Sequence, residues 1–501
     1  MNERQPNLLD RFLGLFSEVR AGEGARVVLL LVNILLLLTA YYVIKTVREP
    51  MILADGSAEL KSWAAAGQAL VLLGFVPLYG WISSKLPRKV LIVVVTAFFL
   101  ACLQGFYLPA VNAVQVSEAL EAGDDAGELS VESALLVVEA LAETLPPVAE
   151  IAVDTEAAQE APEVEASVGP VFSDFFRLGF IFYVWVGIFS LALIAQFWSF
   201  ANDLYSREEG DRLFPIIGIG ATLGAVIGSG VTGQLFALGV ETPMMLQIAS
   251  LLLLLHGISL FFLSGQADEK QNVGSDKATS DEGLSGDGGF KLVLTRPYLR
   301  LIAIVILLLN IVNSTGEYIL GRMVKENGER LLAAGEIESL GGYIGAFYGD
   351  YFLYVNIATV LIQAFVVSRI VKHIGMKGVL FALPIIAFGA YGLLAAGLGL
   401  VGYRWAKTAE NTTDYSVMNT AKALIWLPTT RAEKYKAKQA IDTFVVRVGD
   451  VCSLGFVLVG TQAFTWGLRD FALANLVLVV LWLGATFLLY KRYQSLTAEE
   501  V

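Results

Sequence analysis

A polar stretch near the C-terminal end of the chain carries the side chains best suited to chemistry. It runs from Tyr403 to Asp450 and is flanked by strongly apolar segments. Spacings of three and four place a set of its side chains on one face of a helix: Arg404, Lys407, Asn411, Asp414, Met418 and Lys422. In a membrane such a face must turn toward a water-filled path or a partner, because lone charges in hydrocarbon are costly. The stretch predicts a helix that lines a pathway; an amphipathic helix lying in the interface is the alternative.

Three further apolar segments carry charges at helical spacing. Tyr41, Lys45 and Arg48 share a face of the first segment, and Glu49 lies four residues after Lys45, where the two could pair. Asn310, Asn313 and Glu317 share a face of the seventh predicted segment. Thr443, Arg447 and Asp450 share a face of the eleventh, with Asp442 just before them.

Cations that converge from several helices suit an anionic substrate such as a phosphate or a carboxylate. The predicted substrate-binding residues are Lys45, Arg48, Lys407, Asn411, Lys422 and Arg447. The predicted gating or coupling residues are Glu49, Asn310, Asn313, Glu317, Asp414, Asp442 and Asp450. The alternative for any one of them is a static ion pair between helices.

The composition indicates a polytopic membrane protein. Hydrophobic residues make up 56% of the 501 residues and charged residues only 16%, far from the usage of a soluble domain. The predicted fold is all-α with twelve transmembrane helices. From hydropathy and the polar-face argument these are expected at 27–47, 64–83, 89–110, 175–200, 214–238, 244–264, 299–323, 349–371, 378–400, 403–427, 440–465 and 470–490.

Two polar segments divide the predicted helices. Residues 112–170 hold fourteen acids and no Lys or Arg, which predicts a solvated external insert. Residues 265–298 begin with a Gly/Ser/Asp-rich cytoplasmic linker between two six-helix halves, 27–264 and 299–490. Two six-span halves joined in this way are the major-facilitator arrangement, with substrate bound between the halves. Basic loops place the segment 1–26 and the tail 491–501 in the cytoplasm.

Glycines at four-residue spacing mark the fifth predicted span. Gly220, Gly224 and Gly228 form a small-residue seam of the kind that lets two membrane helices pack closely. A phosphate-binding loop is the weaker alternative, because no GxxxxGK[ST] pattern follows. The spacing therefore predicts a packing surface.

The order of segments resembles the bacterial and plastid ATP/ADP (nucleotide) translocase family, which is distantly similar to major-facilitator transporters. Three stretches carry the resemblance: KTVREPMIL at Lys45–Leu53, FWSFANDLYSREEGDRLFPIIGIGA from Phe197, and Lys422–Asp442 with its alternating lysines before Ala440-Ile441-Asp442. The resemblance implies exchange of adenine nucleotides, with Lys45, Arg48 and Lys422 as candidate phosphate contacts. It also implies a bacterial inner (plasma) membrane location.

We therefore expect a transporter, most simply an ATP/ADP exchanger that works by alternating access. A proton-coupled carrier of another organic anion, drug or peptide is the alternative, because Glu317, Asp414 and Asp450 could titrate. A non-transporting scaffold that uses the acidic insert is the alternative of another class. No nucleophile–base pair, mononucleotide loop or metal-ligand spacing is visible, so we expect no enzyme, no cofactor and no metal. The expected partners are the anionic substrate and the lipid bilayer, not nucleic acid, and the chain is expected to be a monomer.

Overall fold

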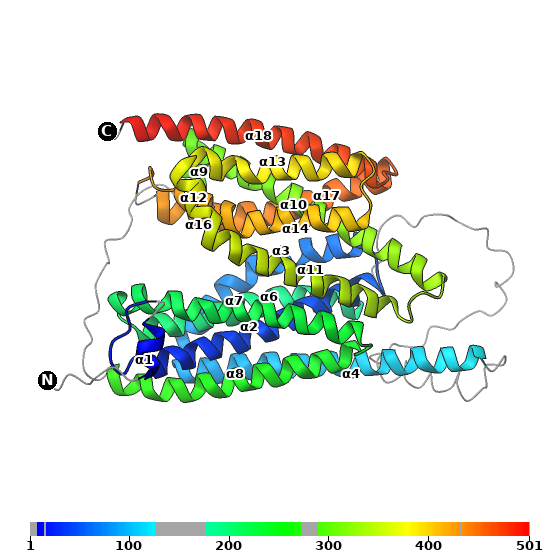
Figure 1. Cartoon of the computed structure of the whole chain (residues 1–501), viewed down its shortest axis with the longest axis horizontal. Helices are drawn as coiled ribbons and strands as arrows, with labels where there is room; N and C mark the ends of the chain where they lie inside the picture. Colours follow the sequence, from blue (N-terminus) through cyan, green and yellow to red (C-terminus); the bar gives the residue numbers. More distant parts are fainter. Residues whose placement is uncertain (1–7, 15–16, 126–175, 272–288, 431–432, 500–501) are drawn as a thin grey trace.

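Helices form all the regular secondary structure of the described residues. The computed structural model describes residues 8–14, 17–125, 176–271, 289–430 and 433–499 (Figure 1). In its first part the helices are α1 (Leu8–Leu13), α2 (Gly24–Leu53), α3 (Ala58–Lys85), α4 (Arg88–Asp125), α6 (Leu178–Leu204), α7 (Arg207–Ala237) and α8 (Thr242–Gln271). In its second part they are α9 (Gly289–Thr295), α10 (Pro297–Ala333), α11 (Leu340–Ile362), α12 (Ser368–His373), α13 (Met376–Ala395), α14 (Leu400–Thr413), α15 (Asn419–Leu424), α16 (Lys438–Ala440), α17 (Val446–Leu458) and α18 (Leu468–Glu499).

Short π-helical turns interrupt several helices of the second part. They are η2 (Gln363–Val367), η3 (Asp414–Met418), η4 (Glu433–Ala437), η5 (Ile441–Val445) and η6 (Val459–Ala463). Single π turns inside α-helices are often found at functional sites. The turn η3 lies inside the polar stretch that the sequence singled out.

Eleven helical stretches of the described residues are long and apolar enough to cross a bilayer. They confirm the predicted all-α membrane fold and correspond to eleven of the twelve predicted spans. The tenth predicted span, 403–427, is not among them because it is polar and is broken into α14, η3 and α15. It nevertheless lies inside the bundle, where α14 packs against α11 and α13 (Figure 1).

The helices form two layers around two hydrophobic cores. Figure 1 shows α2, α4, α7 and α8 in the lower layer and α13, α14 and α18 in the upper layer, with α3 and α11 between them. Buried residues from Leu13 to Leu263 form one core. The other core runs from Val293 to Leu489 and takes in Ile52 and a few neighbouring residues of the first part. The exact domain limits given above stay a prediction.

Most of the predicted insert and half of the predicted linker lie outside the described residues. The helix α4 continues to Asp125, well past the predicted start of the insert at residue 112, and residues 126–175 are not described. Residues 272–288 of the predicted linker are not described either. The segment α1 and the last turn of α18 lie at the same end of the bundle, which we call the termini end (Figure 1). The opposite end, where α2 gives way to α3, is called the distal end.

The predicted glycine seam packs α7 against α2. A Cβ added at Gly224 would lie 2.5 Å from the carbonyl oxygen of Leu35, and one at Gly228 would lie 2.6 Å from that of Thr39. A Cβ at Gly220 would meet the carbonyl oxygen of Leu31 in the same way. Only glycine allows the backbones to come this close. The prediction of a packing surface is confirmed.

The lower-layer helix α7 meets α11, which lies between the layers, at a second glycine contact. A Cβ at Gly233 of α7 would lie 3.0 Å from the backbone nitrogen of Asp350 in α11, beside Gly349. At the distal end, Tyr318 of α10 donates a 2.6 Å hydrogen bond to Glu59 of α3. These contacts hold the two layers together beside the polar groups described next.

Candidate functional site

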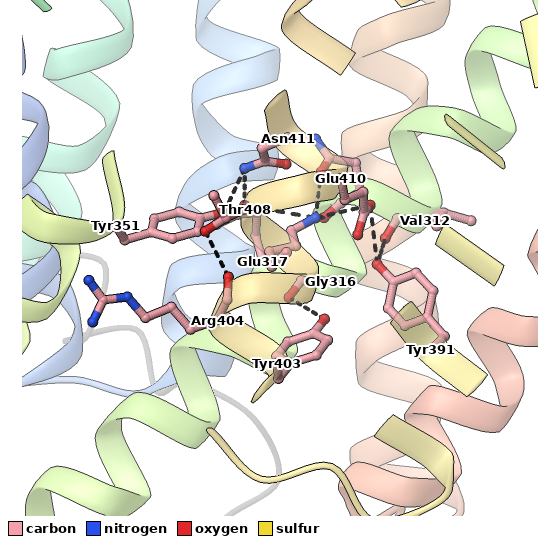
Figure 2. A network of polar contacts seen from close by, with 12 residues as sticks. Val312, Gly316, Glu317, Tyr351, Tyr391, Tyr403, Arg404, Thr408, Glu410 and Asn411 are labelled. Carbon is pink, nitrogen blue, oxygen red and sulfur yellow. Dashed lines mark hydrogen bonds and ion pairs between the residues drawn. The ribbon is translucent and has the colours of Figure 1, made fainter. Parts of the chain in front are cut away.

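Lys407 is the centre of a polar network between α10 and α14 (Figure 2). Its side chain is fully buried, and its Nζ lies 2.6 Å from Asn313 Oδ1, 3.1 Å from Glu410 Oε1 and 3.8 Å from Glu317 Oε1. Glu410 follows Lys407 by one helical turn on α14, whereas Asn313 and Glu317 lie one turn apart on α10. The buried ammonium is therefore held by an amide oxygen and two carboxylates.

Asn411 extends this network to a third helix. Its Nδ2 donates to Glu317 Oε1 at 2.9 Å and to the hydroxyl of Tyr351, on α11, at 2.7 Å. Figure 2 shows these side chains pointing toward one another. The structure thus brings together four predicted residues of two separate segments, Lys407 and Asn411 with Asn313 and Glu317.

Glu410 and three tyrosines, Tyr351, Tyr391 and Tyr403, belong to the network and were missed from the sequence. Tyr391 of α13 donates to Glu410 Oε1 at 3.4 Å and to the carbonyl oxygen of Val312 at 3.1 Å. Tyr403 donates to the carbonyl oxygen of Gly316 at 3.2 Å. The spacing of three between Lys407 and Glu410 was the one available signal. The tyrosines gave none, because they look like ordinary core residues.

Lys422 and Asp414 form an ion pair further along the polar stretch 403–450, after Asn411. Lys422 Nζ lies 3.1 Å from Asp414 Oδ1, and the side chains are 33% and 13% exposed. Eight residues make about 2.2 turns of an α-helix, so the two would sit roughly 80° apart on a regular helix. The π turn η3 takes up one extra residue and brings them to the same face.

The α2 group differs from the predicted pairing of Lys45 with Glu49. Glu49 is 1% exposed and instead binds Arg48 at 2.5 Å and Lys61, from α3, at 2.6 Å. Arg48 also stacks over the ring of Tyr183, 4.1 Å from its centroid. The predicted pair is wrong because α3 supplies a nearer cation, which the sequence of α2 alone does not reveal.

Lys45 points into a cavity between the layers. Its ammonium lies 4.3 Å from the ring centroid of Phe352 and 5.2 Å from that of Tyr42, and no carboxylate among the described residues lies within 4.0 Å of it. The cavity measures about 450 Å³, and Tyr41, Asn356 and Tyr415 also line it. It therefore offers a cation and two aromatic rings from α2 and one aromatic ring from η3.

A second cavity of about 200 Å³ lies among α3, α6, α10 and α17. Arg447 Nη1 and Ser314 Oγ each donate to Asp450 at 3.3 Å on its wall. Lys61 and Glu317 also line it, so this cavity joins the Glu49 group to the Lys407 network.

Two predicted residues lie outside these groups. Asp442 pairs with Lys438 one turn earlier, and both side chains are nearly half exposed. Asn310 donates to the carbonyl oxygen of Ile306 in its own helix at 3.0 Å and packs against Gly449. Among the described residues no group of three or more His, Cys, Asp or Glu side chains is placed to hold a metal ion.

Comparison with solved structures gives the fold. The nucleoside transporter NupG superimposes with a TM-score of 0.54 at 12% identity, over 93% of this chain and 99% of that one. A POT family transporter in complex with 5-aminolevulinic acid superimposes with a TM-score of 0.55 at 10% identity, over 94% and 97% of the two chains. The chain therefore has the fold of these transporters.

Comparison with known sequences is more specific. The chain is 22% identical over 358 residues to ADP,ATP carrier protein 1, chloroplastic, of Arabidopsis thaliana, covering 64% of this chain and 55% of that protein. It is 22% identical over 318 residues to ADP,ATP carrier protein 1 of Chlamydia trachomatis, covering 54% and 56%. The chain thus spans little more than half the length of these relatives.

A family model described as TLC ATP/ADP transporter matches residues 171–493, which is more than half of the chain. Two of the three stretches that carried the resemblance lie within this match, and Lys45–Leu53 precedes it. The resemblance inferred from the sequence is confirmed: the chain belongs to the TLC ATP/ADP transporter family.

Proposed function

We propose that this multi-pass membrane protein exchanges ATP for ADP by alternating access, with substrate bound between its two layers. The observation that carries the proposal is Lys45. Its ammonium faces a cavity and has no carboxylate partner among the described residues, so its charge is available to a phosphate.

The rings around Lys45 suit the other end of a nucleotide. Tyr41, Tyr42 and Tyr415 line the same cavity, and stacking of a nucleobase on an aromatic side chain contributes about 1–3 kcal/mol. The names of the relatives, ADP,ATP carrier proteins, agree with this pairing of charge and rings.

The remaining predicted cations are already paired with acids. Arg48, Lys407, Lys422 and Arg447 each contact a carboxylate. We propose that some of these pairs open to receive phosphate oxygens and close again as the layers rock. The gating role proposed for Asp414, Asp450 and Glu317 follows from the same exchange of partners.

We also propose a bacterial inner membrane location with the termini end in the cytoplasm, because the basic loops 85–89 and 369–377 suit that side. A monomer suffices for this function, since both cavities lie within one chain. The proposal involves no catalysis, cofactor or nucleic acid.

The test is uptake of radiolabelled ATP into proteoliposomes with and without ADP inside. We expect internal ADP to stimulate uptake by the wild type and Lys45→Ala to lose most of that stimulation. Lys372→Ala, which removes an exposed lysine of α12, is the matched control and should keep it. No uptake by a folded wild type would contradict the proposal, and equal uptake by Lys45→Ala would remove Lys45 from the site.

A further inference from the structure

Glu410 is a buried carboxylate that the exchange of nucleotides does not use. Its side chain is 4% exposed, on the face of α14 that packs against α10 and α13. One oxygen, Oε1, accepts from Lys407 and Tyr391, whereas the other, Oε2, is buried with no hydrogen-bond partner among the described residues. Burying an unsatisfied carboxylate oxygen is costly.

The charges around Glu410 do not balance. Lys407 is within 4.0 Å of two carboxylates, Glu410 and Glu317, so the three side chains carry one net negative charge when both acids are ionised. Asp414 and Asp450 each have a cation of their own, Lys422 and Arg447, and Glu49 has two, Arg48 and Lys61. A net charge held inside a membrane protein is costly unless a further cation compensates it.

Among the described residues, no cation besides Lys407 lies within 4.0 Å of the Glu410 carboxylate. The charged groups that act on it are Lys407 on its own helix, Glu317 on α10 and Asp414 in η3. Tyr391 on α13 contributes a neutral hydroxyl, and Asn313 on α10 contributes an amide to Lys407. One added proton makes the set neutral and gives the free oxygen of Glu410 a hydrogen.

The network has a route to water and a link to the opposite layer. Glu317 is 26% exposed and lines the 200 Å³ cavity, so a proton can reach the network there. Glu317 also accepts from Asn411, which donates to Tyr351. Tyr351 belongs to α11, the helix that meets α7 at the Gly233–Gly349 contact. A movement of the layers therefore reaches the pair that holds Glu410.

We propose that Glu410, with Lys407 and Glu317, is a proton-binding site that couples proton movement to transport of the anion. This inference rests on the proposed transport function and adds an energy source to it. A hydronium ion on one side of the membrane gives up a proton, which forms an O–H bond at Glu410. The same proton returns to water on the other side when the network rearranges.

The first test reads the proton directly and does not require transport. Infrared difference spectra of the purified full chain are recorded between alkaline and acidic buffer. We expect a protonated-carboxyl band from a water-shielded group, absent in Glu410→Gln and present in Glu329→Gln, whose exposed acid lies near the end of α10. An unchanged band in Glu410→Gln would overturn the proposal.

A second variant covers a failure of Glu410→Gln to fold. Glu410→Asp keeps the acid on a shorter side chain, so the band should persist at a shifted frequency. A band that does not shift in Glu410→Asp belongs to another group, and the proposal is then wrong.

The second test measures whether ATP uptake is coupled to a proton gradient. Labelled ATP uptake is measured in liposomes without internal nucleotide, with a proton gradient and after a protonophore has removed it. If one proton moves with each nucleotide, a gradient of about one pH unit changes the limiting accumulation about tenfold. The ratio of uptake with and without the gradient should fall to one in Glu410→Gln.

The outcomes separate the two proposals. A wild type that exchanges ATP for ADP but ignores the gradient overturns coupling and leaves exchange intact. A wild type that shows neither ATP/ADP exchange nor gradient-driven ATP uptake would rule out a nucleotide as the substrate. In that case the infrared band alone decides whether Glu410 binds a proton.

Discussion

At the scale of residues, two lysines inside the bundle, Lys45 partly buried and Lys407 fully buried, have different surroundings. Lys45 meets the rings of Phe352 and Tyr42 and keeps its charge available to a ligand. Lys407 is surrounded by an amide oxygen and two carboxylates and is 0% exposed. The difference comes from the neighbours that each meets, because a lysine's charge is strongly attracted to any carboxylate in a medium of low dielectric constant.

Glu49 should be a stabilising residue. Glu49→Gln would leave Arg48 and Lys61 as buried cations without their carboxylate, and breaking a buried ion pair in this way costs about 3–5 kcal/mol. We expect a large drop in the melting temperature of the detergent-solubilised protein. The control is Glu326→Gln. Glu326 pairs with Arg322, but its side chain is 48% exposed, so this variant should change the free energy of unfolding by less than about 1 kcal/mol. Equal shifts in the two variants would contradict this interpretation.

At the scale of elements, α7 is positioned by a capping box at its start and by a glycine seam along its length. Its first turn has a capping box, in which Ser206 accepts from the Glu209 backbone and Glu209 accepts from the Ser206 backbone at 2.8 Å. Further along, its glycines allow α2 to approach. The cap fixes where the helix begins, and the seam fixes which helix it packs against.

The seam can be tested with two alanines on α7. Gly224→Ala places a methyl group 2.5 Å from the Leu35 carbonyl oxygen, and overpacking of this kind costs about 1–3 kcal/mol. Gly218→Ala meets nothing within 4 Å and should be neutral or slightly stabilising, since alanine favours a helix more than glycine does. Thermal unfolding of both variants provides the comparison. Equal loss of stability would mean that the close approach is not what glycine provides.

The start of α2 should respond to acid through Glu23. Partial burial raises the pKa of the Glu23 carboxyl, but hydrogen bonds from Arg212 and from the backbone of Arg20 outweigh it and leave the pKa below its ordinary value. An acid with a lowered pKa in the folded state stabilises the fold above its unfolded value of about 4.3, and that stability is lost as the pH falls through the folded value. We therefore expect Glu23→Gln to lower the melting temperature at neutral pH and to flatten its fall below about pH 4.3. If the melting temperature of Glu23→Gln falls below about pH 4.3 as steeply as that of the wild type, the Glu23–Arg212 pair does not stabilise the fold.

At the scale of the whole molecule, the predicted halves 27–264 and 299–490 touch through polar bonds at the distal end. Tyr318 bonds Glu59, and Lys325 reaches the carbonyl oxygen of Gly56. A pocket of about 410 Å³ lies there, lined by Glu59 and Arg322 among others. Alternating access requires these contacts to open during each cycle.

Holding the distal end shut should stop transport. In a background with Cys102 and Cys452 replaced by serine, Glu59→Cys and Arg322→Cys are combined. They are joined by a short bis-methanethiosulfonate reagent, which forms a reducible disulfide with each thiol and releases sulfinate. We expect the joined protein to lose ATP exchange and to regain it on reduction. Each single variant should keep its own activity after the same treatment. Full exchange by the joined protein would contradict a moving distal end.

The sequence by itself determined the class of the protein and the positions of most spans. Long apolar runs are local properties, and any chain that carries them must satisfy its backbone hydrogen bonds as helices inside a bilayer. The same local reasoning placed the Gly220–Gly228 seam and the polar face of Lys407 and Asn411, because helical periodicity alone decides which residues share a face.

Only the tertiary structure decided which charges meet. Glu49 pairs with Lys61 and not with Lys45 because α3 lies beside α2. Glu410 joins the Lys407 network because α10 and α13 pack on its side of α14. The spacing placed Asp414 and Lys422 on one face, but the π turn η3 that brings them into contact has no signal in the spacing. Ion pairing depends on the rotation and proximity of whole helices, and these are fixed by packing between segments far apart in the chain.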